Sequence, residues 1–386
     1  MKTNVGHSTN KSSFESGVET ATNASKGLEP KIGLLFTSVK NDQKETVKGV
    51  KSVMDAPVIG CTSSGAIIVP EGIITSGENG FSGMMTMDDE NLTVGVACHE
   101  AGTDARKIGQ KVARAALKNA GKMKIPNYFY MVASPKEEEN YLKGIQDIIG
   151  RVKFFGGSAA DDTVTGEWKI ICEDKVFSDG VAVAFFYTNK EMVTEYTGDY
   201  RETEKVGIIT KVDEDRHLLE IDNTPALSKY MEWTGKTLDE VLGGNLLAAT
   251  ILNPLGVKSR QGSLTSVCHP MSSTKENIIM LGNKVAKNTA VMLLEATTDE
   301  LINAVGVNIK DVNTRMNGTP SGYFLVHCGG RKLGIGDRIN EVYDQIKKET
   351  NGKPFITIFT FGEYGYCDHS ANTCGGLMLS FTGISK

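Results

Sequence analysis

The sequence predicts an α/β protein of two domains, with mixed β-sheets layered with α-helices and a ligand cleft between the halves. Three observations support this. The chain has 386 residues, which is more than one hydrophobic core usually organises. Strand and helix patterns alternate through its first half. Apolar strands also run repeatedly into glycine-rich polar turns, and clefts between domains are favoured ligand sites.

The first half is expected to begin with a disordered tail at residues 1–10, followed by a helix that Ser12 or Ser13 caps. The remaining helices are predicted from apolar residues at helical spacing, namely 42–54, 104–120 and 137–149. The strands are predicted at 31–38, 57–61, 80–87, 92–98, 128–133 and 152–155, with an antiparallel meander at 168–172, 176–177 and 180–187.

A polar stretch at residues 191–205 is the expected domain boundary, which divides the chain into domains at 11–195 and 206–386. In the second half, Thr224 is the expected cap of a helix with Pro225 in its first turn. The predicted helices are 224–233, 298–304 and 337–350, and the predicted strands are 207–212, 218–221, several within 277–296, 323–327, 355–361 and 376–382.

The composition is that of an ordinary globular protein, with 40% hydrophobic residues, 23% charged residues and a formal net charge of −5. No stripe of Lys and Arg is present, which argues against nucleic acid or an anionic membrane surface as the main partner. No segment approaches the roughly 20 apolar residues of a membrane span, and the N-terminus lacks an apolar signal region. We therefore expect a cytoplasmic protein.

The seven cysteines are odd in number and form no CxxC pair. A disulfide framework is therefore not expected, and free thiols agree with a reducing compartment. The cysteines are Cys61, Cys98, Cys172, Cys268, Cys328, Cys367 and Cys374.

Four strand-to-turn junctions share one character: an apolar strand followed by glycines and small polar residues. Glycine lets the backbone approach a bound group closely, so the junctions together predict a pocket for a small molecule. They are Val58–Gly65, Phe154–Asp162, Val326–Arg331 and Phe355–Tyr366.

These turns, in this order, resemble the signatures of the FIST family, a sensory module with halves called FIST N and FIST C. Val58–Gly65 resembles the first-half signature, and Phe155–Asp161 resembles the family's Gly-Gly-x-Ala-x-Asp turn. Asn223–Ala226 is similar to the start of the C-terminal half, although the usual glycine is missing. Cys328–Arg331 and Phe361–Gly365 resemble the last two signatures.

The resemblance covers nearly the whole chain and implies an intracellular sensor of small metabolites such as amino acids. We recognise no output domain, and therefore expect signalling through a separate protein such as a kinase, cyclase or chemoreceptor. Some members bind haem, so a haem-binding gas sensor is an alternative. The family's His-Asn-x-Thr run corresponds here to His369, Asn372 and Thr373 with altered spacing.

Charged residues in these turns suggest an amino-acid-like ligand that bears a carboxylate. Arg331 beside two glycines is suited to a bidentate grip on an anionic group, although a surface arginine in a salt bridge is the plainer interpretation. Asp161, Asp162 and Glu363 are candidates to bind an ammonium group. For Asp162, a turn-capping role is the favoured alternative.

The hydroxyls and amides of Thr62–Gly65 are candidates to cradle an anion, although a plain strand-exit turn needs no ligand. The predicted ligand-binding residues are Cys61, Thr62, Ser63, Ser64, Gly65, Gly156, Gly157, Ser158, Asp161, Arg331, Gly362, Glu363, Tyr364 and His369.

An enzyme is the competing class, with Cys61 as nucleophile and His327, His369 or His99 as base. No G-x-S-x-G elbow occurs, and we assign no catalytic residue. Cys328, Cys367, His369 and Cys374 lack zinc-finger spacing, so no metal is expected. Without a CxxCH motif covalent haem is excluded, and no cofactor is expected apart from the non-covalent haem alternative.

Overall fold

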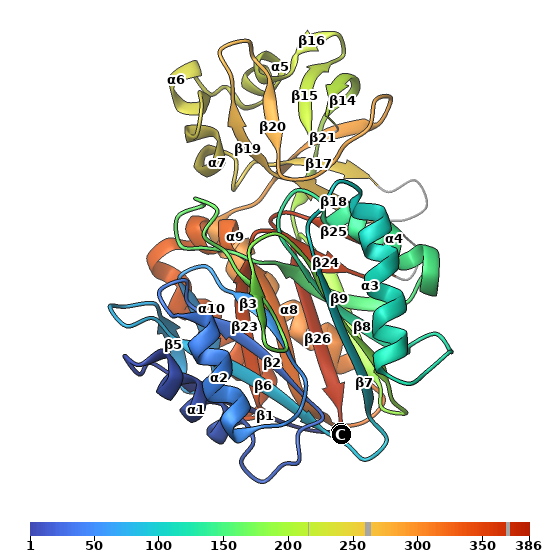
Figure 1. The fold of residues 1–386 in the computed structure, drawn as a ribbon. Coiled ribbons are helices and arrows are strands. Elements are labelled where there is room, and N and C mark those ends of the chain that lie inside the picture. The colour runs from blue at the N-terminus through green and yellow to red at the C-terminus, as the bar shows by residue number, and fades with distance from the viewer. Residues whose placement is uncertain (215, 259–263, 368–370) are drawn as a thin grey trace.

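The computed structural model describes residues 1–214, 216–258, 264–367 and 371–386. The chain forms a large body of three sheets with a smaller upper lobe above it (Figure 1). Helices cover the outer faces of the body sheets, and the inner faces meet in one core. The predicted α/β class with mixed sheets and helices is confirmed.

The first body sheet contains mainly strands of the N-terminal segment, and two helices, α1 (Ser13–Ala24) and α2 (Gln43–Val53), pack on it. Its order is β1 (Lys2–Ser8), β6 (Ser82–Asp88), β2 (Ile32–Thr37), β3 (Val58–Thr62), β10 (Ile170–Cys172) and β11 (Lys175–Phe177).

The expected disorder of residues 1–10 is wrong. β1 pairs with β6 along its whole length, from Lys2 opposite Asp88 to Ser8 opposite Ser82. The N-terminal ammonium group also lies 3.3 Å from the Asp89 carboxylate. The segment is polar because β1 is an edge strand, which pairs with another strand on one side only.

The second body sheet is covered by α3 (Ala105–Asn119) and α4 (Glu138–Ile149). Its order is β25 (Thr373–Gly375), β24 (Glu363–Gly365), β9 (Lys153–Ser158), β8 (Tyr128–Ala133), β12 (Gly180–Tyr187) and β7 (Thr93–Glu100). The predicted meander is wrong for its last strand: β10 and β11 pair in the first sheet, whereas β12 lies between β8 and β7.

The third body sheet is covered by α8 (Thr298–Arg315) and α10 (Ile339–Thr350), and α9 (Gly329–Ile335) with a 3₁₀ turn at Gly336–Arg338 precedes α10. Its order is β13 (Met192–Thr197), β26 (Leu379–Ser385), β22 (Pro320–Cys328), β23 (Phe355–Thr360), β4 (Ala66–Val69) and β5 (Gly72–Thr75). The helix predicted at 298–304 thus continues much further, to Arg315.

The N- and C-terminal segments exchange strands in both directions. The early strands β4 and β5 extend the third sheet beside β23, and the late strands β24 and β25 extend the second sheet beside β9. Residues 191–205, expected to be a boundary, form β13 and the start of β14. The division at 195 and 206 stays a prediction.

The three inner faces meet around Phe324 of β22. Its ring centroid lies 5.5 Å from that of Phe36 on β2, 5.6 Å from Tyr130 on β8 and 5.7 Å from Phe155 on β9. Aromatic rings at these separations bury large apolar areas, each worth roughly 1.5–3 kcal/mol. This core holds the strand ends of all three sheets in fixed relative positions.

The upper lobe has a separate core that includes Leu218, Tyr230 and Leu293. Its strands are β14 (Arg201–Asp213), β15 (His217–Ile221), β16 (Thr224–Pro225), β17 (Leu255–Lys258), β18 (Thr265–Cys268), β19 (Pro270–Ser273), β20 (Ile279–Leu281) and β21 (Ala290–Glu295). Its helices are α5 (Ala226–Thr234), α6 (Leu238–Val241) and α7 (Asn245–Ala249). Pro225, and not Thr224, is the cap residue of α5.

Candidate functional site

Each body sheet contributes a parallel strand pair whose carboxyl ends lead into one of the predicted turns: β2 with β3, β8 with β9, and β22 with β23. Backbone hydrogen bonds join three of these turns, and the turn after β22 adjoins them through the pairing of β22 with β23, which ends with Cys328 opposite Thr360. The amide of Ala160 donates to the Thr62 carbonyl at 3.1 Å, Ser64 donates to Phe359 at 2.9 Å, and Ser158 donates to Gly362 at 2.8 Å. The structure therefore brings the four predicted turns together.

A cavity of about 330 Å³ lies where these turns face the upper lobe. The body contributes residues such as Ser64, Cys328 and Phe361, and the upper lobe contributes Leu247 and Met271. A small ligand here would contact both parts of the molecule, as ligands in clefts between domains do.

Gly329 and Gly330 form part of the cavity wall; a side chain would clash with a neighbour at Gly330 and would be in close contact with neighbours at Gly329. A Cβ atom on Gly329 would lie 3.5 Å from Ser64 Cβ, and one on Gly330 would lie 2.7 Å from Leu377 Cδ2 and 3.4 Å from His269 Cε1. The two glycines thus connect the Ser64 side of the cavity with the His269 side.

Two opposite charges lie at the Ser64 side, on either side of Gly65. A Cβ atom on Gly65 would lie 2.9 Å from Lys332 Nζ and 3.9 Å from Asp162 Oδ1. Lys332 Nζ donates to the Ser64 carbonyl at 2.9 Å, and Asp162 Oδ1 accepts from the Gly65 amide at 2.8 Å. Burial lowers the pKa of Lys332, and the nearby Asp162 partly opposes that shift. Neither group forms an ion pair with the other within the described residues.

At the other side of the cavity lie His269 and Asn283. The Asn283 side chain is buried, its Nδ2 donates to the Cys374 carbonyl at 3.3 Å, and its Oδ1 has no partner among the described residues. His269 Nε2 donates to the Leu247 carbonyl at 3.0 Å. Burial lowers the pKa of His269 to about 4, so its ring is neutral at neutral pH.

Asp161 organises the loop of residues 163–167, whose Val164 lines the cavity. Its buried carboxylate accepts hydrogen bonds from the backbone amides of residues 163–167, at 3.0 Å from Thr163, 2.7 Å from Gly166 and 2.9 Å from Glu167. Val164 in this loop has φ of +58°, a conformation that β-branched residues rarely adopt. The carboxylate therefore holds a strained loop in place beside the cavity.

Arg331 does not line the cavity. Its side chain is fully buried, and its guanidinium donates to the carbonyls of Gly198 at 2.5 Å, Leu301 at 3.1 Å and Leu377 at 3.3 Å. The guanidinium therefore binds carbonyl oxygens of the protein itself, and Arg331 is not among the lining residues. The plainer expectation of a surface arginine in a salt bridge is wrong as well, because Arg331 lies in the interior.

Glu363 is also enclosed by protein groups. Its carboxyl accepts from Thr360 Oγ1 at 2.8 Å and from the Met378 amide at 2.9 Å. Burial raises the pKa of Glu363 to about 8, so the carboxyl holds a proton over much of the neutral range. Asp161 and Glu363 thus stabilise the wall behind the cavity.

Several other predicted residues lie behind the lining. Ser63 Oγ donates to the Ala66 carbonyl at 2.6 Å, and Ser158 Oγ lies 2.7 Å from Tyr364 Oη. Gly156, Gly157 and Glu363 belong to the paired strands β9 and β24, Thr62 is the last residue of β3, and Gly362 lies in the turn before β24. His369 lies outside the described residues. Of the predicted set, Ser64 lines the cavity, with Gly65 next to it.

The sequence analysis missed the lining residues of the upper lobe, namely Leu247, His269, Met271 and Asn283. None of them follows a motif or a charge pattern that marks a site. Lys332 was missed although it directly follows the Cys-Gly-Gly-Arg turn. The sequence gives no signal that separates these two residues: α9 directs Arg331 inward and Lys332 towards the cavity.

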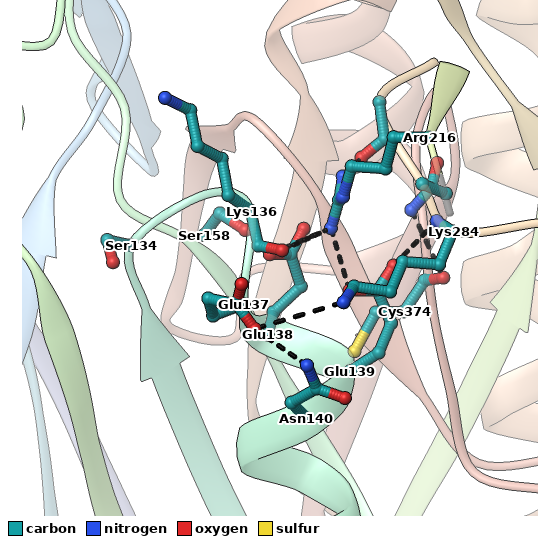
Figure 2. A network of polar contacts seen from close by, with 12 residues as sticks. Ser134, Lys136, Glu137, Glu138, Glu139, Asn140, Ser158, Arg216, Lys284 and Cys374 are labelled. Carbon is teal, nitrogen blue, oxygen red and sulfur yellow. Dashed lines mark hydrogen bonds and ion pairs between the residues drawn. The ribbon is translucent and has the colours of Figure 1, made fainter. Parts of the chain in front are cut away.

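A second cavity of about 790 Å³ adjoins the first and shares Val164, Met271, Gly282 and Phe361 with it. Beside it, Arg216 of the upper lobe reaches the body, as Figure 2 shows. Its Nη2 lies 2.7 Å from the Glu139 carboxylate and 3.3 Å from Glu138, and it donates to the Lys136 carbonyl at 2.8 Å.

This network joins the lobes at a second point. The Lys284 amide donates to Glu139 Oε1 at 3.0 Å, and Arg216 Nη1 donates to the Gly282 carbonyl within the upper lobe. Burial, reinforced by the neighbouring Glu139, raises the pKa of Glu138 to about 8. We call Arg216, Glu138, Glu139 and Lys284 the junction network.

The two thiols that lie in the predicted turns, Cys61 and Cys328, give no support to the enzyme alternative. Cys61 is fully buried, and burial raises its pKa. Cys328 reaches the cavity, but burial and nearby Glu363 raise its pKa too. Burial and Arg331 lower the pKa of His327 to about 3, and its Nδ1 bonds the neighbouring carbonyl of Cys328. No activated thiolate–imidazole pair follows from these environments.

His269, which lines the first cavity, offers no open Nε2 for an axial bond to a haem, because this nitrogen donates to the Leu247 carbonyl. Within the described ranges, no group of three or more His, Cys, Asp or Glu residues is placed to hold a metal ion.

No helix in the described part of the chain has the length and apolarity needed to cross a membrane.

Comparison with known families agrees with the order of the turns. The model of the FIST N domain matches residues 31–224, and that of the FIST C domain matches residues 226–366. No curated protein matches the chain. The two matches cover most of the sequence and confirm the resemblance. The chain therefore belongs to the FIST family, whose domains are recognised as small-ligand sensory domains of signalling proteins.

Proposed function

We propose that this protein is a cytoplasmic sensor that binds an amino-acid-like metabolite in the 330 Å³ cavity and reports its occupancy to a separate signalling protein. The observation that carries the proposal is the pair of Lys332 and Asp162 around Gly65. An α-amino acid has a carboxylate and an ammonium group on one carbon, so two neighbouring, unpaired opposite charges are its complement.

In this proposal the anchoring cation is Lys332 and not Arg331. Lys332 lines the cavity, and its hydrogen bond to the Ser64 carbonyl leaves other ammonium hydrogens for a carboxylate. Asp162 uses Oδ1 for the Gly65 amide, and its second oxygen is suited to accept from a ligand ammonium group. The capping role favoured for Asp162 from the sequence and this ligand role are compatible.

The position of the cavity supports a sensory role. A ligand that contacts Lys332 and Asp162 of the body as well as Leu247 and Asn283 of the upper lobe favours one placement of the lobe. A partner protein that recognises this placement would distinguish the occupied from the empty sensor. Signalling in this way requires no chemical step.

The proposal is tested by thermal shift with the twenty amino acids, followed by calorimetry on each amino acid that binds. We expect Lys332→Met to weaken binding by roughly tenfold to a hundredfold, since one charge-assisted hydrogen bond is lost. Met keeps a long apolar side chain at this position but removes the ammonium group, which lies 5.2 Å from the Phe359 ring centroid. Lys348→Met, on an exposed lysine whose side chain is 75% accessible, is the matched control.

Ligand analogues supply the second arm. For a bound amino acid, the corresponding amine without the carboxylate and the acid without the amine should both bind more weakly. Unchanged affinity in Lys332→Met would refute the lysine anchor. The absence of a shift with all twenty amino acids would refute the amino-acid sensor. A Soret band in the purified protein would favour the haem alternative.

A further inference from the structure

We propose that the cavity selects an aromatic amino acid whose side chain ends in a hydrogen-bond donor, tyrosine or tryptophan, and that Asn283 is the residue that recognises the donor. This inference rests on the proposed function, because it takes Lys332 and Asp162 as the place of the amino-acid backbone. It adds the class of side chain and the residue that determines specificity.

The cavity has two chemically different sides connected by a glycine wall. Lys332 and Asp162 lie around Gly65 at one side, next to Ser64. Gly329 adjoins Ser64, and Gly330 adjoins His269. An amino acid held by its charged groups at the first side therefore directs its side chain along the glycines towards the second side.

Asn283 and His269 form the second side, together with Gly376. A Cβ atom on Gly376 would lie 3.3 Å from Asn283 Oδ1 and 3.3 Å from His269 Cβ, so the glycine leaves room in front of both residues. Asn283 is only 5% exposed, and its Nδ2 bond to Cys374 fixes which way the amide faces. The side chain thus holds a fixed acceptor oxygen beside Gly376, a residue of the cavity lining.

That oxygen, Asn283 Oδ1, is without a hydrogen-bond partner in the described part of the protein. A buried acceptor without a donor is unfavourable, and most such groups in proteins are satisfied. His269 does not supply the donor, because its Nε2–H is directed to Leu247 and its lowered pKa keeps the ring neutral. A ligand with an N–H or O–H at the end of its side chain would satisfy the oxygen.

The walls between the two sides are suited to a flat apolar group. Phe361, Met271 and Ile339 line the cavity, and methionine sulfur and aromatic edges pack favourably against rings. An aliphatic side chain would fill this region but would leave Asn283 Oδ1 unsatisfied. A ring that carries a terminal donor, the phenol of tyrosine or the indole of tryptophan, meets both requirements.

Binding sites built around a hydrogen bond discriminate strongly against ligands that lack it, because the buried protein group then loses its partner. Calorimetry should therefore show that tyrosine binds at least about tenfold more tightly than phenylalanine, or tryptophan than 1-methyltryptophan. In Asn283→Leu this ratio should fall to about one. Asn283→Asp, which keeps an acceptor oxygen, should retain the preference for the donor.

The outcomes separate the two proposals. Equal binding of both members of each pair to the unaltered protein overturns donor recognition and leaves the amino-acid sensor standing. If aliphatic or acidic amino acids bind more tightly than tyrosine and tryptophan, donor recognition is overturned and the amino-acid sensor again stands. Failure of all twenty amino acids to bind overturns the proposed function itself. If Asn283→Leu does not fold, the ligand pairs on the unaltered protein and Asn283→Asp decide the question.

Discussion

Two groups of charged residues lie on different sides of the cavities, and they are held in different ways. In the wall behind the cavity, Asp161, Arg331 and Glu363 are fully buried, and most of their hydrogen bonds go to backbone groups of the body. In the junction network, Arg216 is partly exposed and crosses from the upper lobe to carboxylates of the body.

This difference separates residues that hold the fold from residues that set the placement of the lobe. The hydrogen bonds between a buried charged group and backbone amides or carbonyls break only when that part of the body unfolds. A contact between side chains of two lobes can break while both lobes stay folded. We therefore expect mutations in the wall to lower global stability and mutations in the junction network to act locally.

The largest effect is expected for Asp161→Ala. The substitution removes the acceptor of five consecutive backbone amides, which would lower the free energy of unfolding by on the order of 3 kcal/mol. Urea denaturation measures this loss. Asp161→Asn keeps one acceptor oxygen and should lose less, and Asp174→Ala, at an exposed turn, is the control. A loss no larger than that of Asp174→Ala would contradict the structural role of Asp161.

A smaller, pH-dependent effect is expected for Glu363. Its folded-state pKa of about 8 lies above the ordinary value of 4.5, so the folded protein binds the proton more tightly than the unfolded chain. The contribution of Glu363 to the free energy of unfolding is therefore fully present below about pH 4.5. It decreases as the pH rises through 8, by at most about 1.4 kcal/mol per pH unit. Glu363→Gln should flatten this decrease.

The best window for this measurement is pH 6.5–8. Burial lowers the pKa values of His269 and His327 below 6.5, so their contributions, which rise with pH, level off above that value. Glu138, with a pKa of about 8, acts with the same sign as Glu363. Subtracting the urea midpoints of Glu363→Gln from those of the unaltered protein isolates Glu363. A constant difference across the window would contradict a raised pKa.

Much of the fold was predictable because its core strands and amphipathic helices have clear periodicity. The strand at 31–38 and the helix at 104–120, for example, correspond closely to β2 and α3. The exchange of strands was not predictable, because β4 is short and pairs with a strand almost 290 residues later, and β5 joins the sheet only through β4. Pairing at that distance leaves no pattern in a local window of sequence.

The site was predictable only as far as its turns. Glycines after apolar strands correctly indicated where the chain segments converge, since their backbone hydrogen bonds join them. The direction of each side chain was not predictable: Arg331 and Lys332 are adjacent, yet the first is buried among carbonyls and the second lines the cavity. Which one faces a ligand depends on the start of α9, and sequence alone does not fix that rotation.

The smallest effect on global stability is expected for Arg216→Ala. The substitution leaves Glu138 buried without its cation, but a carboxyl whose pKa is already about 8 takes up a proton and limits the cost. The urea midpoint should therefore change less than in Asp161→Ala. Amide hydrogen exchange should instead accelerate at residues 136–139 and 282–284, where the lobes meet.

Arg106→Ala provides the matched control, since Arg106 pairs with Asp147 at 2.8 Å on the exposed surface of the body. It should leave exchange at the junction unchanged. A sensor that works through lobe placement should also bind its ligand differently once Arg216 is lost, because part of the binding free energy selects one placement of the lobe. If Arg216→Ala lowers global stability as much as Asp161→Ala, or leaves junction exchange unaltered, the two regions do not differ in the way their hydrogen bonds indicate.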